Sequence, residues 1–330
     1  MSLAVNVITG FLGSGKTSLL RRLLAQEALG ETALLINEFG EVGIDHLLVE
    51  EVAPDTVLLP SGCVCCSVRG DLKAALLTLH GRRSRGEIPA FRRVLLETTG
   101  LADPGPILAT LNLDPQLRGR FHLGLLVTVV DAEHASLQEG LHPEWLNQVT
   151  AADRLLLSKA DRVAPAVLER LDRHLAQLNP TATRALVATV ASGDDLLLGE
   201  GLRAADPGAE VGRWRLFAAV AEGRHGSAEV CCLEFDRPLD WMAFGVWLSM
   251  LLRCHGQRIL RVKGILDVID ASQPIVIHGV QHSLHPPVHL PAWPSSGERR
   301  SRLVFIVRDL DTALLRRSFA AFMGGLGQAA

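Results

Sequence analysis

The stretch Gly10-Phe11-Leu12-Gly13-Ser14-Gly15-Lys16-Thr17 lies between a short apolar run at residues 3–9 and a segment at 16–28 whose leucines recur at helical spacing. A short apolar run that ends in glycine is typical of a buried parallel strand, and the leucine spacing predicts a helix. The eight residues match the pattern G-x-x-x-x-G-K-[S/T] in the strand–loop–helix setting that the pattern requires. The sequence therefore predicts a phosphate-binding loop between the first strand and the first helix.

The residue types in this loop suit bound phosphate groups. Glycines let backbone N–H groups curl around phosphate oxygens, and the N-terminus of the helix adds a favourable dipole. The Lys16 ammonium reaches the β- and γ-phosphates, and the Thr17 hydroxyl is a ligand for Mg²⁺. A glycine-rich turn with a chance lysine is the alternative, but only four of the 33 basic residues are lysines. The predicted nucleotide contacts are Gly10, Gly13, Ser14, Gly15, Lys16, Thr17 and Ser18.

Strand and helix patterns alternate along the first two thirds of the chain. The predicted strands after the loop are residues 33–37, 94–97, 123–130 and 154–158, and the predicted helices are 72–81, 104–111 and 165–178. Alternation of this kind implies a parallel sheet with right-handed crossovers. We therefore expect an α/β fold of the P-loop NTPase type over residues 1–205, with helices flanking the sheet.

The regular alternation of strand and helix patterns ends after residue 196. Residues 206–227 belong to a glycine-rich, acidic stretch without a strong period, which favours a linker. From residue 228 to 330 the patterns predict a smaller α+β domain. Its predicted strands are 229–235, 259–269, 274–281 and 302–307, and its predicted helices are 240–253 and 311–323.

Glu97 is placed to hold a magnesium ion beside the phosphate loop. Residues 94–100 read Val-Leu-Leu-Glu-Thr-Thr-Gly, an apolar strand that ends in a carboxylate and is followed by Gly100. We expect Thr17 and Glu97 to hold Mg²⁺ and the Gly100 N–H to contact the γ-phosphate, a contact that exists only before hydrolysis. Lys16, Thr17 and Glu97 are thus the candidate catalytic residues. A solvated strand end is the alternative for Glu97.

The choice of base is predicted by Ser158-Lys159-Ala160-Asp161, which follows a strand and resembles the NKxD element of GTPases. The Asp161 carboxylate accepts from the N1–H and the exocyclic amine of guanine, a donor pair that adenine lacks. The stem of Lys159 can pack along the base plane. Ser158 is shorter than the usual asparagine, so we expect a weaker tie between base and phosphate loop. A serine helix cap is the alternative.

Cys63, Cys65 and Cys66 form the distinctive element of the chain. Three thiols within four positions can converge on one ion, and thiolates suit Zn²⁺ or Cu(I) far better than Mg²⁺. A three-thiol site leaves one coordination position open, as a carrier needs. Glu38 and Glu41, in the acidic stretch upstream, are candidates for a fourth ligand or a magnesium contact. The alternatives are small buried residues or a redox pair.

Composition narrows the class of protein. The chain has 330 residues, 48% of them apolar, and a net charge of −3, so no surface of bulk positive charge points to nucleic acid. It contains no apolar run of the length that spans a membrane, and its N-terminus does not read as a signal peptide. The clustered cysteines are poorly spaced for disulfides, so we expect a reducing, cytoplasmic setting.

Five motifs follow one another in the order GFLGSGKT, INEFGEVGID, GCVCC, ETTGLADP and SKAD, ahead of the α+β part. In these residues the chain resembles the CobW-like metallochaperone GTPases, relatives of the urease and hydrogenase maturation GTPases, over nearly its whole length. The resemblance implies slow GTP hydrolysis to GDP, coupled to binding a transition metal, often zinc, and delivering it to a client protein. It also implies a phosphate role for residues 10–17, a magnesium role for Glu97, a base-reading role for Asp161 and a metal role for Cys63, Cys65 and Cys66.

Two other sets of residues are expected to lie outside the metal site. His278, His282, His285 and His289 alternate with prolines in a predicted loop and are interpreted as surface or structural histidines. Cys231, Cys232 and Cys254 lie in apolar contexts and are expected in the core.

Two competing functions stay open at this point. One is a metal-independent regulatory or assembly GTPase with structural or redox cysteines. The other is a cobalamin-pathway accessory protein, which differs only in metal and client. The oligomeric state is open as well.

Overall fold

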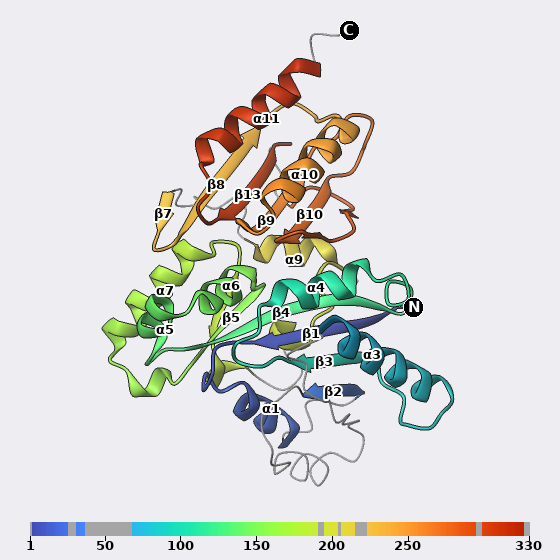
Figure 1. Cartoon of the computed structure of the whole chain (residues 1–330), viewed down its shortest axis with the longest axis vertical. Coiled ribbons are helices and arrows are strands. Elements are labelled where there is room, and N and C mark those ends of the chain that lie inside the picture. The colour runs from blue at the N-terminus through green and yellow to red at the C-terminus, as the bar shows by residue number, and fades with distance from the viewer. Residues whose placement is uncertain are drawn as a thin grey trace. The chain divides into compact units, whose positions relative to one another are not determined.

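The computed structural model describes residues 2–25, 31–36, 68–190, 195–203, 206–214, 223–294 and 299–326. The chain divides into two compact units (Figure 1). The first comprises residues 1–172 and 183–204, and the second comprises 173–182 and 205–330. Within the described segments, none of the helices combines the length and the apolar composition that crossing a bilayer requires.

The first unit is built on a six-stranded parallel sheet with the order β2-β3-β1-β4-β5-β6. Its strands are β1 (Leu3–Thr9), β2 (Thr32–Ile36), β3 (Arg93–Glu97), β4 (Phe121–Asp131), β5 (Arg154–Ser158) and β6 (Thr183–Leu186). Its main helices are α1 (Lys16–Ala25), α3 (Val68–Ser84), α4 (Pro104–Leu113), α5 (Ala135–Leu141) and α6 (Pro143–Ala151), together with the part of α7 (Pro165–Leu178) up to Asp172. The expected P-loop NTPase fold, a parallel sheet flanked by helices, is confirmed.

The predicted elements of this unit match the observed ones closely. The strand at 154–158 and the helix at 165–178 have the predicted bounds, whereas β4 and α3 each extend further at both ends than the patterns suggested. Helix α1 is described to Ala25 and β2 to Ile36, so the rest of their predicted lengths, residues 26–28 and 37, lies outside the described residues.

Helix α1 is fixed to the sheet by the leucines that predicted it. Leu19, Leu20, Leu23 and Leu24 are buried in one apolar cluster with Ile8 of β1 and residues of β2 to β5. Burying a leucine side chain contributes about 1.5–3 kcal/mol. Because β1 and α1 are held by this packing, the loop of residues 10–15 between them has two rigid ends.

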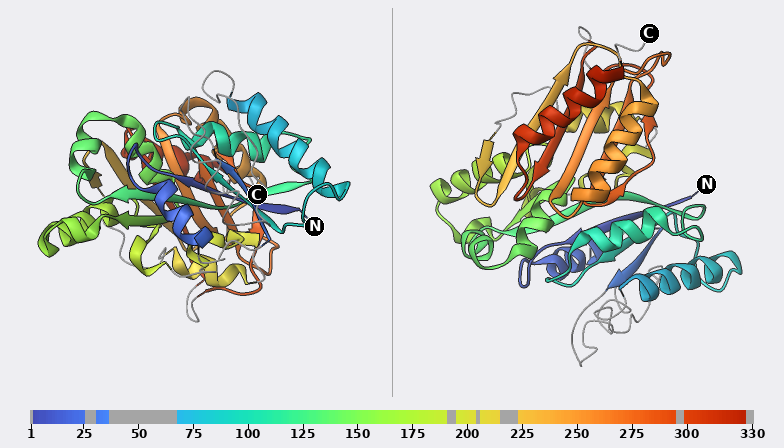
Figure 2. Two further views of the ribbon diagram at one scale, coloured as in Figure 1. Left: turned by 90° about the horizontal axis from the view of Figure 1, so that it is seen from below. Right: turned by 45° about the horizontal axis from the view of Figure 1, so that its top comes forward.

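The second unit contains a seven-stranded antiparallel sheet with the order β11-β10-β9-β13-β8-β7, and β12 also pairs with β10. The strands are β7 (Gly223–His225), β8 (Ala228–Phe235), β9 (Ile259–Leu266), β10 (Ile275–Val280), β11 (Ser283–Leu284), β12 (Val288–His289) and β13 (Ser301–Val307). Helices α10 (Trp241–His255) and α11 (Thr312–Leu326) pack against this sheet through one apolar cluster (Figure 2). The predicted α+β character of this part is confirmed by these elements.

The stretch expected to be a linker, 206–227, contains regular elements. Helix α9 (Pro207–Arg213) begins after Asp206, whose side chain accepts from the Ala209 N–H, and β7 lies near the end of the stretch. Trp214, directly after α9, is buried, and the Lys263 ammonium of β9 lies 4.1 Å from its ring centroid. The first helix of the stretch is therefore anchored on the second unit. The predicted domain bounds of 1–205, 206–227 and 228–330 stay a prediction.

Candidate nucleotide site

The phosphate loop has a backbone conformation that its glycines make possible. Gly10, Gly13 and Gly15 have φ angles of 142°, 71° and 95°, in the region that favours glycine. A Cβ on Gly10 would lie 2.3 Å from the Val129 carbonyl oxygen, whereas one on Gly13 would meet nothing within 4 Å. Gly10 is thus required by close packing and Gly13 by its backbone angle, as a loop that wraps phosphate oxygens needs.

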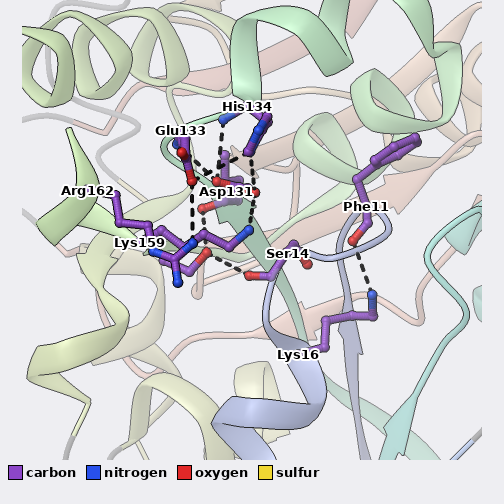
Figure 3. A network of polar contacts seen from close by, with 10 residues as sticks. Phe11, Ser14, Lys16, Asp131, Glu133, His134, Lys159 and Arg162 are labelled. Carbon is purple, nitrogen blue, oxygen red and sulfur yellow. Dashed lines mark hydrogen bonds and ion pairs between the residues drawn. The ribbon is translucent and has the colours of Figure 1, made fainter.

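Lys16 turns back over this loop. Its ammonium donates to the Gly10 carbonyl at 2.8 Å and to the Phe11 carbonyl at 3.3 Å, and the side chain is buried (Figure 3). A positive charge therefore lies directly at the loop. Ser14 is also buried, whereas Ser18 is exposed in the first turn of α1.

Thr17 and Glu97 are brought together from different elements. The Thr17 hydroxyl donates to Glu97 Oε1 at 2.7 Å, and Glu97 is buried at the end of β3. The contact follows from the sheet order, because β3 pairs with β1 so that Glu97 lies beside Ile8, just before the loop. A hydroxyl and a carboxylate oxygen are the hard ligands that Mg²⁺ prefers, so this pair fits the ion.

Gly100 lies against the phosphate loop. A Cβ on Gly100 would come within 2.5 Å of the Leu12 backbone nitrogen, so the backbones approach as closely as glycine permits. Before it, the Thr98 hydroxyl donates to Thr9 Oγ1 at 2.8 Å and the Thr98 N–H donates to the Ile8 carbonyl at 2.9 Å. Residues 98–103, here called the Thr98 loop, are therefore fixed beside residues 10–15.

Ser158 reaches the phosphate loop despite its short side chain. Its hydroxyl contacts the Ser14 carbonyl oxygen at 2.6 Å and the Val130 carbonyl oxygen at 3.3 Å. The short side chain thus still reaches the phosphate loop, because β5 brings Ser158 directly against Ser14. The expected weaker tie between base and phosphate loop stays a prediction. Lys159 has a left-handed φ of 53°, and Asp161 is exposed in a 3₁₀ turn, Ala160–Arg162.

Asp131, which the sequence analysis missed, organises the polar network beside this motif. Its buried carboxylate accepts from the Lys159 ammonium at 2.6 Å, from His134 Nδ1 at 3.0 Å and from the Glu133 N–H at 2.9 Å (Figure 3). Burial alone would raise the pKa of Asp131, but the hydrogen bonds from Lys159 and His134 outweigh it and hold the pKa below its ordinary value. The sequence signal that could have identified Asp131 is an acidic residue at the end of a long apolar strand.

The same network contains the one cluster of potential metal ligands found in the described segments, Asp131, Glu133 and His134. The Lys159 ammonium already lies on Asp131, and Arg162 lies 3.6 Å from Glu133. A cation would therefore meet two positive side chains. We interpret the network as a support for Lys159.

Helix α6 supplies a second missed residue, Gln148. It is fully buried, and its Nε2 donates to the carbonyl oxygens of Gly100 and Ala102 in the Thr98 loop. A buried glutamine in the mixed sequence of residues 143–151 gave no pattern that distinguishes it from an ordinary helix residue.

The candidate transition-metal ligands, Cys63, Cys65, Cys66, Glu38 and Glu41, lie outside the described residues. Strand β2 ends at Ile36 before this part of the chain, and α3 begins at Val68 after it. Their role stays a prediction.

The remaining cysteines are only partly as expected. Cys231 and Cys232 are buried in β8, in line with the prediction. Cys254 is exposed, so its expected core position is wrong. The buried residues Phe244, Trp247, Leu248 and Leu252 of α10 all precede Cys254, which lies in the exposed part of the last turn.

The C-terminal histidines are mostly structural. His278 lies on β10 rather than in a loop, and its ring stacks 3.7 Å from the ring of the buried His285. His282 Nδ1 contacts the Leu252 carbonyl oxygen at 2.9 Å, and His289 is exposed.

Comparison with known families gives two matches. Residues 4–185 match the family described as CobW/HypB/UreG, nucleotide-binding domain. Residues 228–323 match the Cobalamin synthesis protein cobW C-terminal domain.

Individual relatives match along nearly the whole chain. Zinc chaperone YjiA of Escherichia coli is 34% identical over 96% of this chain and 98% of its own. Zinc chaperone CobW of Sinorhizobium is 28% identical, with 96% of each chain covered. The crystal structure of Zn(II)-bound YjiA GTPase from E. coli superposes with a TM-score of 0.73 at 28% identity, covering 98% of this chain and 99% of that one.

Proposed function

The chain belongs to the CobW/HypB/UreG family, and on this premise we propose that it is a GTPase that carries zinc and delivers it to a client metalloprotein. The strongest support from the structure is the contact between Thr17 and Glu97 beside a glycine-shaped phosphate loop. The support from the comparisons is that full-length relatives are named zinc chaperones and that one is a GTPase with zinc bound.

The phosphates of GTP bind along residues 10–17 in this proposal. Lys16 exchanges the Gly10 and Phe11 carbonyl oxygens for oxygens of the β- and γ-phosphates, so its ammonium neutralises the charge that develops during hydrolysis. Thr17 and Glu97 hold Mg²⁺, which when bound neutralises phosphate charge. Water attacks the γ-phosphorus, the bond to the β–γ bridging oxygen breaks, and GDP and phosphate are the products.

The base lies at the ends of β4 and β5. Asp161, exposed in its turn, accepts from the two donors of guanine, and the stem of Lys159 packs along the base. The Lys159 ammonium is held by Asp131, and Ser158 connects this end of the sheet to Ser14. The hydrogen bond from the Ser158 hydroxyl to the Ser14 carbonyl oxygen thus connects the proposed base contacts with the proposed phosphate contacts.

Zinc is the cargo in this proposal. The thiolates of Cys63, Cys65 and Cys66 bind the ion, and Glu38 or Glu41 supplies a further oxygen. Because only three of these ligands are thiolates, a ligand from the client can replace the carboxylate oxygen, whereas a closed four-thiolate site offers no such position. Delivery to a metalloprotein in the cytoplasm fits a chain whose relatives are named chaperones.

The proposal is tested by measuring GTP hydrolysis and zinc binding on one preparation of the full chain. Wild-type protein is expected to hydrolyse GTP in the presence of Mg²⁺ and to bind one zinc ion in a competition with a chromophoric chelator. A variant with Cys63→Ser, Cys65→Ser and Cys66→Ser is expected to keep hydrolysis and lose the zinc. A wild-type chain that binds no zinc would favour the metal-independent GTPase instead, and unchanged zinc binding in the variant would overturn the assignment of the zinc site to the three cysteines.

A further inference from the structure

We infer that Gln148 of α6 is a positioning residue that sets the orientation of the Thr98 loop and thereby its response to the γ-phosphate. This inference rests on the proposed function, because it takes Gly100 as the γ-phosphate contact. Gln148 contacts Gly100 and Ala102 of the Thr98 loop, and Gly100 lies against Leu12 of the phosphate loop, so Gln148 acts through the Thr98 loop.

The contacts of Gln148 use both hydrogens of its amide. Nε2 donates to the Gly100 carbonyl at 3.1 Å and to the Ala102 carbonyl at 3.0 Å. Both neighbours are acceptors, so the NH₂ end of the amide must face the loop. The two carbonyls lie on either side of Leu101, and one side chain thus fixes two peptide units of the loop backbone.

A second residue of α6 holds the far end of the same loop. Asn147 Nδ2 donates to Asp103 Oδ2 at 3.1 Å, and Asp103 Oδ1 accepts from the Gly105 N–H as the N-cap of α4. The loop therefore meets adjacent side chains of one helix at residues 100, 102 and 103. A single buried amide needs hydrogen-bond partners only for itself. Here two neighbouring amides, those of Asn147 and Gln148, hold the same loop.

Helix α6 is itself held firmly. The Thr128 hydroxyl of β4 donates to the Gln148 carbonyl at 2.7 Å, and Trp145, Leu146 and Val149 are buried. Because packing fixes the helix, the Gln148 amide has a fixed position against which the loop is oriented.

The orientation matters because peptide units are planar. The hydrogen bonds from Gln148 fix the peptide planes that follow Gly100 and Ala102. The Gly100 N–H lies in the preceding plane, whose Thr99 carbonyl accepts from the Ala102 N–H at 3.1 Å, so the turn that Gln148 holds also orients this N–H. On its other side the loop touches Leu12 of the phosphate loop through Gly100. Gln148 therefore determines how the amides of the loop are presented to the phosphate loop.

The test compares the nucleotides that differ in the γ-phosphate. Gln148→Met keeps the length of the side chain and removes both donors. We expect the kcat for GTP to fall about tenfold or more, which is the usual effect of losing a preorganised donor network. Affinity for a non-hydrolysable GTP analogue falls with it, while affinity for GDP, which has no γ-phosphate, stays within about twofold.

Thr110→Val is the matched control. Thr110 is also buried, and its hydroxyl donates to the Pro106 carbonyl at 2.9 Å within α4, so the change removes a buried helical hydrogen bond of similar length. We expect this variant to keep the wild-type ratio of analogue affinity to GDP affinity. Thermal unfolding of each variant is recorded beside the affinities.

The outcomes separate the inference from the proposed function. If Gln148→Met lowers analogue and GDP affinity equally, or changes neither, the positioning role is wrong. If Gln148→Met does not fold, the ratio of analogue affinity to GDP affinity is measured for Asn147→Ala instead. Asn147 is partly exposed and contacts Asp103 of the same loop. Absence of GTP hydrolysis in the wild-type chain contradicts the proposed function instead, whatever the variants do.

Discussion

The Ser158 hydroxyl lies 2.6 Å from the Ser14 carbonyl oxygen, across 144 positions of sequence. It connects the end of β5, next to the proposed base-reading residues, with the loop that carries the proposed phosphate-binding residues. A nucleotide touching both regions thus binds to a surface whose two halves are already hydrogen-bonded to each other.

We expect Ser158→Ala to weaken GTP and GDP binding by the same factor. A buried neutral hydrogen bond contributes about 0.5–1.5 kcal/mol, which corresponds to roughly 2- to 13-fold in affinity. Isothermal titration with each nucleotide measures this, and Ser84→Ala on the exposed side of α3 is the control. A loss of affinity for GTP alone would mean that Ser158 affects binding of the γ-phosphate and not the connection between β5 and the phosphate loop.

Lys16→Ala is expected to abolish GTP hydrolysis, because no other side chain among the described loop residues 10–17 carries a positive charge to the phosphates. Lys73→Ala is the matched control, since Lys73 pairs with Asp114 on the surface. Phosphate release at saturating GTP measures the effect. Wild-type turnover in the Lys16 variant would contradict the phosphate-loop assignment.

Asp161→Asn is expected to reduce the preference for guanine, because an amide cannot offer two acceptor oxygens to the two guanine donors. The preference is measured by competing GTP and ATP against one fluorescent guanine nucleotide. Asp172→Asn on α7 is the control, since Asp172 pairs with Arg184. Equal competition by GTP and ATP in the wild-type chain would overturn the base-reading assignment.

Asp131 is expected to stabilise the fold in a pH-dependent way. Its pKa is lowered in the folded state, because the hydrogen bonds from Lys159 and His134 outweigh its burial. The contribution is therefore complete above the unfolded pKa of about 4 and is lost as the pH falls through the lower folded value.

The measurement is chemical denaturation of wild type and Asp131→Asn across the acid range. Near neutral pH the variant should be less stable by about 1.5–3 kcal/mol, the size of hydrogen bonds to a charged group. The difference should shrink as the pH falls below 4. A difference that is constant with pH would show that the carboxylate does not change its protonation in this way.

The fold could be predicted because its signals are local. Four leucines at helical spacing, a glycine-rich loop and apolar strand runs each act within a few residues, and the parallel sheet follows from their alternation. Glu97 was also predictable, because the carboxyl ends of parallel strands meet at one edge.

Other site residues depend on tertiary neighbours that no local pattern contains. Gln148 is functional in our account only because the Thr98 loop passes over it, and Asp131 only because β5 brings Lys159 beside it. Helix α9 is too short to show a helical period of apolar residues in the sequence, and it is anchored by the buried Trp214. Cys254 shares an apolar sequence context with the core, but it is exposed in the last turn of α10.

The last prediction concerns coupling between zinc and nucleotide. In the β2–β3 ladder Ile36 lies opposite Glu97, so the part of the chain that carries Glu38, Glu41 and the three cysteines starts beside the proposed magnesium ligand. It ends at α3, which begins at Val68. A change at Glu97 between the GDP and GTP states would therefore first affect Ile36, the described residue that precedes the segment with the candidate metal ligands.

We expect zinc affinity to differ between the GDP state and the GTP-analogue state. Linkage requires zinc to change the relative affinities for the two nucleotides by the same factor, and couplings of this kind are about 1–3 kcal/mol, or roughly 5- to 150-fold. Chelator competition in each nucleotide state measures the factor at fixed pH, because zinc displaces protons from thiols whose ordinary pKa is about 8.5. The variant with all three cysteines replaced by serine is the control and should show weak binding without nucleotide dependence. Equal zinc affinity in both states would contradict nucleotide-driven delivery, because hydrolysis of GTP would then leave the affinity for zinc unchanged.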